Sequence, residues 1–248
     1  MTVSPRQISS RERRFILFID RIIMLIGKHW LAMVASFLFI FSALPFLAPV
    51  LMHDGITAPA EGIYKAYSLT CHQLSYRTFF FFGEQPVYTL DELRVLVPGG
   101  QNQDGISFFW RDFIGNSTLG YKMAWCERDV SIYASMFLAF IALGLLGARV
   151  PKLNWRAYLL FVVPMAFDGF WQLFTSPVDI MPFLPLHESN AELRIITGAL
   201  FGIGSVWLVF PYVEEAMRDA YAQAKSQFER GKAHEEELKN PHANPPPL

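Results

Sequence analysis

Residues 30–52 read WLAMVASFLFIFSALPFLAPVLM and contain no Asp, Glu, Lys or Arg. A helix of this length extends about 35 Å, which exceeds the roughly 30 Å hydrocarbon core of a bilayer. The stretch is therefore predicted to cross a membrane as a somewhat tilted helix. Pro45 and Pro49 fall in its last third, where a proline can kink or end a helix.

Three further stretches have the same apolar character: residues 130–148, 157–178 and 195–213, of which the middle one contains Asp168 as its single charged residue. The chain of 248 residues is 52% hydrophobic and only 17% charged, whereas a soluble domain usually carries about 25% charged residues. Because the charged residues are missing from the apolar stretches, these stretches are predicted to be surrounded by lipid. The predicted fold class is an all-α membrane protein, a bundle of about four transmembrane helices.

The segment before the first span is apolar over residues 15–27, but it is too short to cross a membrane and is interrupted by Asp20 and Arg21. We expect an amphipathic helix in the membrane interface; a fifth span is the alternative. The predicted division of the chain is a basic N-terminal region with the interfacial helix (1–29), a membrane domain (30–213), and a charged helix followed by a proline-rich disordered tail (214–248).

Lys and Arg flank the predicted spans in a pattern that sets their orientation. With four spans, the N-terminal flank, the loop at residues 149–156 and the region after residue 213 all lie on one side, and all are rich in Lys and Arg. Because cytoplasmic loops carry an excess of these residues, both termini are predicted to be cytoplasmic and the chain to be a multi-pass plasma-membrane protein. Residues 53–129 then form a long loop segment on the outer face.

Four polar clusters lie at the outer ends of the predicted spans. Asp168 is the sharpest signal, because a carboxylate in hydrocarbon costs several kcal/mol unless it is paired, protonated or hydrated. Gln172 follows one turn later on the same helix face. Counting residues along each helix places the four clusters at the same depth near the outer surface of the membrane. A shared polar site is therefore predicted there. Its residues are Cys71, His72, Gln73, Arg77, Cys126, Arg128, Asp129, Tyr133, Asp168, Gln172, Ser189, Asn190 and Arg194.

The two cysteines have alternative interpretations. Cys, His and carboxylate side chains bind zinc and similar divalent ions, and the predicted ligand set is Cys71, His72, Cys126 and Asp168. A disulfide between Cys71 and Cys126 is the alternative, because the outer face is oxidising. It would close a loop of about 55 residues and stabilise the fold by ~3–4 kcal/mol. Unpaired structural cysteines are the third interpretation.

The arginines of the site are also open to two interpretations. Arg77 and Arg128 can hold an anionic group, such as a lipid phosphate, through bidentate hydrogen bonds. Alternatively they neutralise nearby carboxylates, namely Glu127, Asp129 and Asp168.

The order of these motifs resembles domain-of-unknown-function family 2085 (DUF2085), a family of predicted prokaryotic membrane proteins. The family pattern runs CHQ-x-x-x-R-x-F-F, C-x-R-C-x-x-I-Y, D-G-x-x-Q and S-x-N-x-L-R-x-x-T-G. The similarity extends over roughly residues 60–210. The matching residues are Cys71, His72, Gln73, Arg77, Phe79, Phe80, Cys126, Arg128, Ile132, Tyr133, Asp168, Gly169, Gln172, Ser189, Asn190, Leu193, Arg194, Thr197 and Gly198.

Two departures from the family pattern bear on the site. Asp129 stands in place of the second cysteine of C-x-R-C, which weakens a thiol-pair mechanism but leaves a carboxylate able to bind a hard or borderline ion. A segment near residues 84–119 looks inserted between the first two motifs, and we place it on the outer face. The resemblance implies a membrane architecture and a shared site, and no reaction.

The predicted function is a multi-pass membrane protein with an outer-face site that binds a metal or another ligand. One alternative is a membrane-embedded enzyme using Cys71 or His72 with Asp168 on a lipid or redox substrate. Another is a non-catalytic subunit of a membrane complex, since Gly198 and Gly202 have a spacing that allows helices to approach closely. The predicted partners are the lipid bilayer and a membrane protein or a second copy of the chain. The net charge of −1 excludes a global electrostatic case for nucleic acid.

Overall fold

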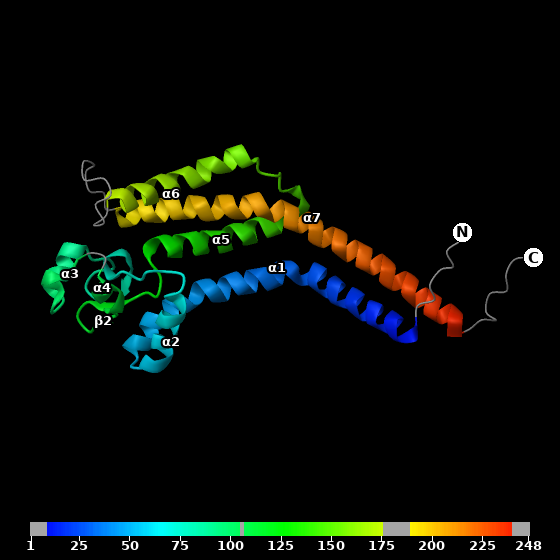
Figure 1. Ribbon diagram of the computed structural model, residues 1–248, viewed down its shortest axis with the longest axis horizontal. Helices are drawn as coiled ribbons and strands as arrows, with labels where there is room; N and C mark the ends of the chain where they lie inside the picture. The colour runs from blue at the N-terminus through cyan, green and yellow to red at the C-terminus, as the bar shows by residue number, and fades with distance from the viewer. Residues whose placement is uncertain (1–8, 105–106, 176–188, 240–248) are drawn as a thin grey trace, which may run out of the picture.

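The computed structural model describes residues 9–104, 107–175 and 189–239, and within them the chain is mostly helical. Long helices run side by side along one axis, and a cap of short elements covers one end of the bundle (Figure 1). The long helices are α1 (Ser10–His53), α5 (Glu127–Leu146), α6 (Trp155–Thr175) and α7 (Ala191–Lys239).

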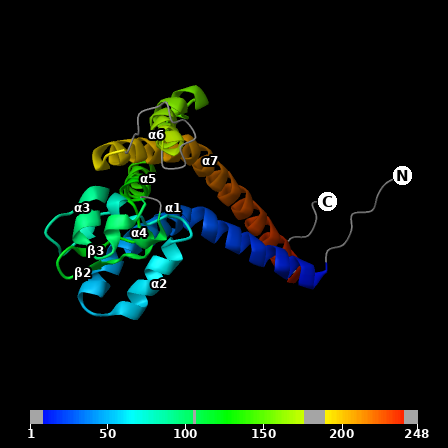
Figure 2. The ribbon, with the colours of Figure 1, turned by 60° about the vertical axis from the view of Figure 1, so that its left-hand side comes forward.

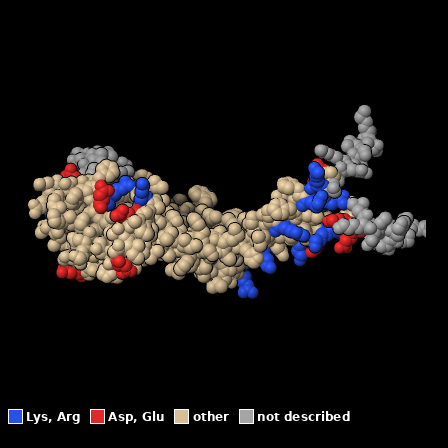
Figure 3. Space-filling view, turned by 90° about the horizontal axis from the view of Figure 1, so that it is seen from below, with Lys and Arg blue, Asp and Glu red and all other residues tan. Residues whose placement is uncertain are grey.

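Three of the described helices are long and apolar enough to cross a membrane: α1, α5 and α7. Their apolar side chains point outward, as Phe37, Leu138 and Leu145 show with exposed fractions of 63%, 65% and 85%. Figure 3 shows Lys and Arg concentrated at the end of the molecule opposite the cap, with a nearly uncharged surface between the two ends. A large exposed apolar belt of this kind marks a surface that is covered, here by lipid.

α1 joins two elements that the sequence predicted to be separate. The interfacial helix expected over residues 15–27 is part of one continuous helix of 44 residues. A capping box at Ser9 begins this helix, and Pro45 and Pro49 lie inside it without ending it. The charged first part of α1 and its apolar second part therefore have the same secondary structure, although their composition differs.

α7 likewise merges the last predicted span and the charged helix after it into one helix of 49 residues. Its second half packs on the first half of α1, and together they leave the bundle as an extended pair (Figures 1 and 2). We call this pair, residues 10–29 with 214–239, the arm. Trp30 and Glu214 mark its base through a 3.2 Å hydrogen bond from the indole N–H. The predicted disordered tail, 240–248, lies outside the described residues.

Close packing between α5 and α7 confirms the interpretation of the two spaced glycines. A Cβ on Gly198 would lie 2.1 Å from the hydroxyl of Ser131, and a Cβ on Gly202 would lie 2.1 Å from that of Ser135. Only glycine allows this approach. α6 packs on another face of α7, where Gly204 faces Phe161.

The expected outer loop segment is a folded cap rather than a loop. It contains α2 (Thr57–Tyr67), α3 (Leu90–Leu96), α4 (Phe108–Asp112) and an antiparallel sheet in the order β1 (Phe80–Phe81), β3 (Gly120–Lys122), β2 (Gly115–Asn116). The inserted segment supplies Tyr88, Leu93 and Trp110, which are almost fully buried. These large side chains give the segment enough apolar surface to build a core within the cap, together with Tyr76 and Phe80.

Candidate metal centre at the rim of the bundle

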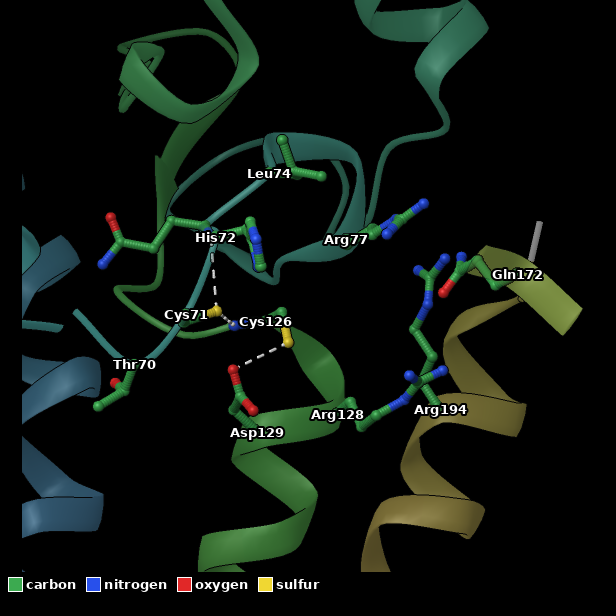
Figure 4. A pocket seen from close by; sticks show the side chains of 11 residues that line it. Thr70, Cys71, His72, Leu74, Arg77, Cys126, Arg128, Asp129, Gln172 and Arg194 are labelled. Atoms are coloured by element: carbon green, nitrogen blue, oxygen red, sulfur yellow. Dashed lines mark hydrogen bonds between the residues drawn. The ribbon is translucent and has the colours of Figure 1, made fainter. Parts of the chain in front are cut away.

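A pocket of about 200 Å³ opens where the cap meets the ends of α5, α6 and α7 (Figure 4). It brings together nine of the predicted site residues from four separate parts of the sequence. The lining residues are Thr70, Cys71, His72, Gln73, Leu74, Arg77, Cys126, Arg128, Asp129, Gln172 and Arg194. Figure 4 shows the cysteines on one side of the pocket and the arginines toward the other.

A strained turn after α2 presents Cys71 to the pocket. Gln73 has φ = +54°, a left-handed conformation that a non-glycine residue keeps only when its surroundings hold it. Its side-chain amide donates to the carbonyls of Tyr64 at 2.9 Å and Ala124 at 2.8 Å. The ammonium of Lys122 donates to the Gln73 carbonyl at 2.7 Å. These bonds fix the turn and with it the position of the Cys71 sulfur.

Lys122 is a fully buried lysine that the sequence did not single out. Besides the Gln73 carbonyl, its Nζ donates to the carbonyls of Arg111 at 2.6 Å and Trp110 at 3.3 Å. Burial lowers the pKa of Lys122 to about 7. A buried lysine persists only with such partners, so Lys122 joins the turn, the end of α4 and β3. Lysines are nearly always exposed, and no local pattern marks this one.

The cysteines and Asp129 form a close cluster. Cys126 is the N-cap residue of α5, and its thiol donates to Asp129 Oδ2 at 3.1 Å. The Cys71 sulfur accepts the backbone N–H groups of Cys126 at 3.3 Å and Gln73 at 3.4 Å. The two sulfurs and an Asp129 oxygen all lie within 4.8 Å of one another. This is a set of ligand atoms of the type that binds zinc.

Both cysteines are free thiols, with Cys71 buried and Cys126 half-buried. Two main causes raise the pKa of the Cys71 thiol: the larger is the hydrogen bond with the Cys126 side chain, and the second is burial. The Cys71 thiol therefore keeps its proton at neutral pH unless a cation displaces it. Backbone N–H groups directed at a sulfur also stabilise a metal-bound thiolate.

Two members of the predicted ligand set lie elsewhere in the site. His72 is exposed and lines the pocket, but its ring is not among the closely grouped ligand atoms. Asp168 is 3% exposed and accepts hydrogen bonds from Arg128 and from the Ser189 hydroxyl, the latter at 3.0 Å. Asp168 thus neutralises an arginine, as a carboxylate in a bundle of apolar helices requires. Asp129 is the carboxylate beside the sulfurs.

A second buried ion pair crosses the rim. Arg194 in the first turn of α7 donates to Glu127 of α5 at 3.0 Å, and their side chains are 5% and 0% exposed. Together with the Arg128–Asp168 pair, it ties α5 to both α6 and α7. The sequence raised Glu127 as a carboxylate partner for an arginine, and the structure pairs it with Arg194.

The other predicted site residues serve the packing around the pocket. The Arg77 guanidinium lies 5.0 Å from the centre of the Tyr76 ring. Tyr133 stacks on Trp125 with ring centroids 4.5 Å apart. The Asn190 side chain accepts the N–H of Leu193 at 2.8 Å and so caps the start of α7.

The comparison with known protein families supports the membrane character of the chain. Residues 116–208 match the DUF2085 family, described as a predicted membrane protein. The resemblance to this family is thereby confirmed over residues 116–208, which include Cys126, Asp129, Asp168 and Arg194, whereas the motif that begins at Cys71 lies outside the matched range. An uncharacterised protein of Methanocaldococcus jannaschii is 28% identical over 194 residues, which is 74% of this chain and 92% of that protein. No solved structure matches the chain.

Proposed function

We propose that this membrane protein binds a divalent transition-metal ion, with zinc as the leading candidate, through Cys71, Cys126 and Asp129. The observation that carries the proposal is the mutual distance of at most 4.8 Å among the two sulfurs and the carboxylate oxygen. Ligand atoms around one tetrahedral zinc ion lie about 3.5–4 Å apart. Small side-chain rotations are sufficient to close the difference.

The charges and surroundings of the cluster support the same occupant. Two thiolates and one carboxylate carry three negative charges, which more than balance a divalent cation, and soft sulfur ligands select zinc-like ions over magnesium or calcium. Three protein ligands leave a fourth position of a tetrahedral ion to be filled, which the exposed His72 or a water molecule from the pocket can do. Zinc sites with such a fourth position are the ones that act on substrates, so the pocket would admit a small ligand to the ion.

The proposed membrane arrangement has four spans, formed by α1, α5, α6 and α7, with both termini cytoplasmic and the metal centre on the outer face of the plasma membrane. α6 supports the fourth span because it runs beside α7 and exposes Leu160 and Val163 by 75% and 55%. The concentration of Lys and Arg on the arm supports the orientation.

The test is the metal content of the protein purified in detergent without chelators. We expect about one zinc-like ion per chain by elemental analysis, and its loss in Cys71→Ser, Cys126→Ser and Asp129→Asn. The matched control is Asp54→Asn, the same chemical change at an exposed residue of the cap end, which should retain the ion. A wild-type protein that stays metal-free even after equilibration with zinc would refute the proposal.

Thiol labelling separates the metal centre from a disulfide. If the cysteines bind a metal, a chelator alone should make the half-buried Cys126 reactive to a maleimide, because removing the ion frees its sulfur, whereas Cys71 stays buried. Cysteines that label only after a reductant is added are joined by a disulfide, and that result would contradict metal binding in the purified protein.

A further inference from the structure

The arm carries an exposed apolar surface on its α1 side. This apolar surface lies beyond Trp30 and Glu214, where the helices become charged, and therefore past the membrane-spanning part of the bundle. The opposite side of α1 packs on α7, for example where Leu17 meets Gly231. The exposed residues recur every three or four positions, as on one face of a helix: Phe15, Phe18, Ile22 and Leu25, at 64%, 57%, 37% and 61% exposure.

Charge divides the arm in the same way. Residues 10–29 hold five Lys and Arg and two Asp and Glu, a net charge of +3, whereas residues 214–239 hold five and seven, a net charge of −2. Arg11, Arg14 and Lys28 are exposed and follow the same three- and four-residue spacing as the apolar row. The α1 side of the arm is therefore both apolar and basic, and the α7 side is acidic and polar.

The shape of the arm directs this face. Figure 1 shows the arm bending away from the bundle axis toward the α1 side, so that α1 lies on the inner side of the bend. The inner side of such a bend faces the membrane surface around the bundle. The apolar and basic face is thus turned toward lipid, and the acidic face toward water.

We infer that the α1 face of the arm binds the bilayer surface from which the arm emerges, with its apolar row in the interface and its arginines and lysine on anionic headgroups. Basic amphipathic helices bind membranes in this way. A second copy of the chain fits the face less well, because two such faces would oppose a charge of +3 with another of +3. The inference stands independently of the metal centre, which lies at the other end of the bundle.

Photocrosslinking in vesicles tests the inference on the full-length protein. A benzophenone amino acid replaces Phe18, and the protein is reconstituted into vesicles of phosphatidylcholine with phosphatidylglycerol. We expect lipid adducts in a yield within about twofold of that from the same probe at Phe37, which faces lipid. The matched control is the probe at Gln223, an exposed position on the α7 side, which should give only a small fraction of that yield.

The alternatives give different products. Covalent protein dimers from the Phe18 probe would identify a second copy on this face, and the absence of both lipid and protein adducts would identify water; either result overturns the inference. The charge component is tested with Arg11→Glu combined with Arg14→Glu. This variant should lower the lipid adduct yield several-fold in the anionic vesicles, and Lys225→Glu on the α7 side should leave the yield unchanged.

Discussion

The two ends of the helical bundle are held together by different interactions. Beneath the cap, α5 is tied to its neighbours by two ion pairs, of which Arg194–Glu127 is almost completely buried. Toward the arm, the pair Lys152–Glu215 leaves each side chain 49% exposed. A buried pair costs much free energy when one partner is missing, whereas water and salt screen an exposed pair. The comparison shows that fixed charges organise the end that contains Cys71, Cys126 and Asp129, while apolar packing holds the other end.

The largest expected effect comes from breaking the buried pair. Glu127→Ala leaves the Arg194 guanidinium without its carboxylate in a site where that side chain is 5% exposed. We expect the free energy of unfolding to fall by about 3–5 kcal/mol, measured by denaturant titration in mixed detergent micelles. Adding Arg194→Met to Glu127→Ala should recover much of the loss, because no buried charge then remains unpaired.

Glu215→Ala is the matched change at the other end. It breaks an exposed ion pair and should leave the unfolding midpoint nearly unchanged. If both alanine variants unfolded at the same denaturant concentration, the two ends would not differ as described.

A smaller effect is expected from the helix contact beside the rim. In Gly202→Ala the added Cβ would lie 2.1 Å from the Ser135 hydroxyl and 2.5 Å from the Ile132 carbonyl. Helix backbones must move apart to admit it, at about 1–3 kcal/mol, measured by the same titration. Gly144→Ala is the control, since its Cβ would meet Leu31 at an ordinary 3.6 Å. Equal losses at the two glycines would contradict close packing of α5 on α7.

The cap supplies a further effect on stability, which depends on pH. Burial lowers the pKa of Lys122 to about 7 from an ordinary value of 10.5. Above pH 7 the unfolded chain therefore binds a proton that the folded chain has released, and stability should rise with pH. The Cys71 thiol does not oppose this below its ordinary pKa of 9.0, because it is protonated in both states.

Thermal unfolding of the metal-free protein between pH 7 and 9, followed by tryptophan fluorescence, measures the effect. The melting temperature should increase across this range in the wild type and stay level in Lys122→Met. A wild-type melting temperature as level as that of Lys122→Met would show that the ammonium stays charged throughout.

The sequence predicted the long helices well because hydropathy is a local property. It misplaced their ends for the same reason: the changes in composition near residues 29 and 213 mark where the surrounding solvent changes. Helix ends depend instead on caps, such as that at Ser9, and on tertiary packing. α1 and α7 pack on each other beyond the apolar region, so both remain helical there.

The meeting of Cys71 and Cys126 could be anticipated from topology, but the carboxylate beside them could not be chosen by depth alone. Asp168 has the right depth, yet it faces Arg128 from α6. Asp129 shares a turn with Cys126 at the start of α5, and residues three apart on a helix are neighbours. That local spacing was the available signal. Lys122 had none, because its carbonyl partners come from distant turns of the cap.

α7 carries Arg194 in its first turn at the rim and ends in the arm, without interruption of the helix. A helix of 49 residues is about 70 Å long, and Pro211 lies inside it without ending it. A tilt of a few degrees at one end moves the other by several ångströms, as in any lever. Holding the far end against a surface therefore restricts the angles open to Arg194 and Glu127, with no direct contact between the two ends.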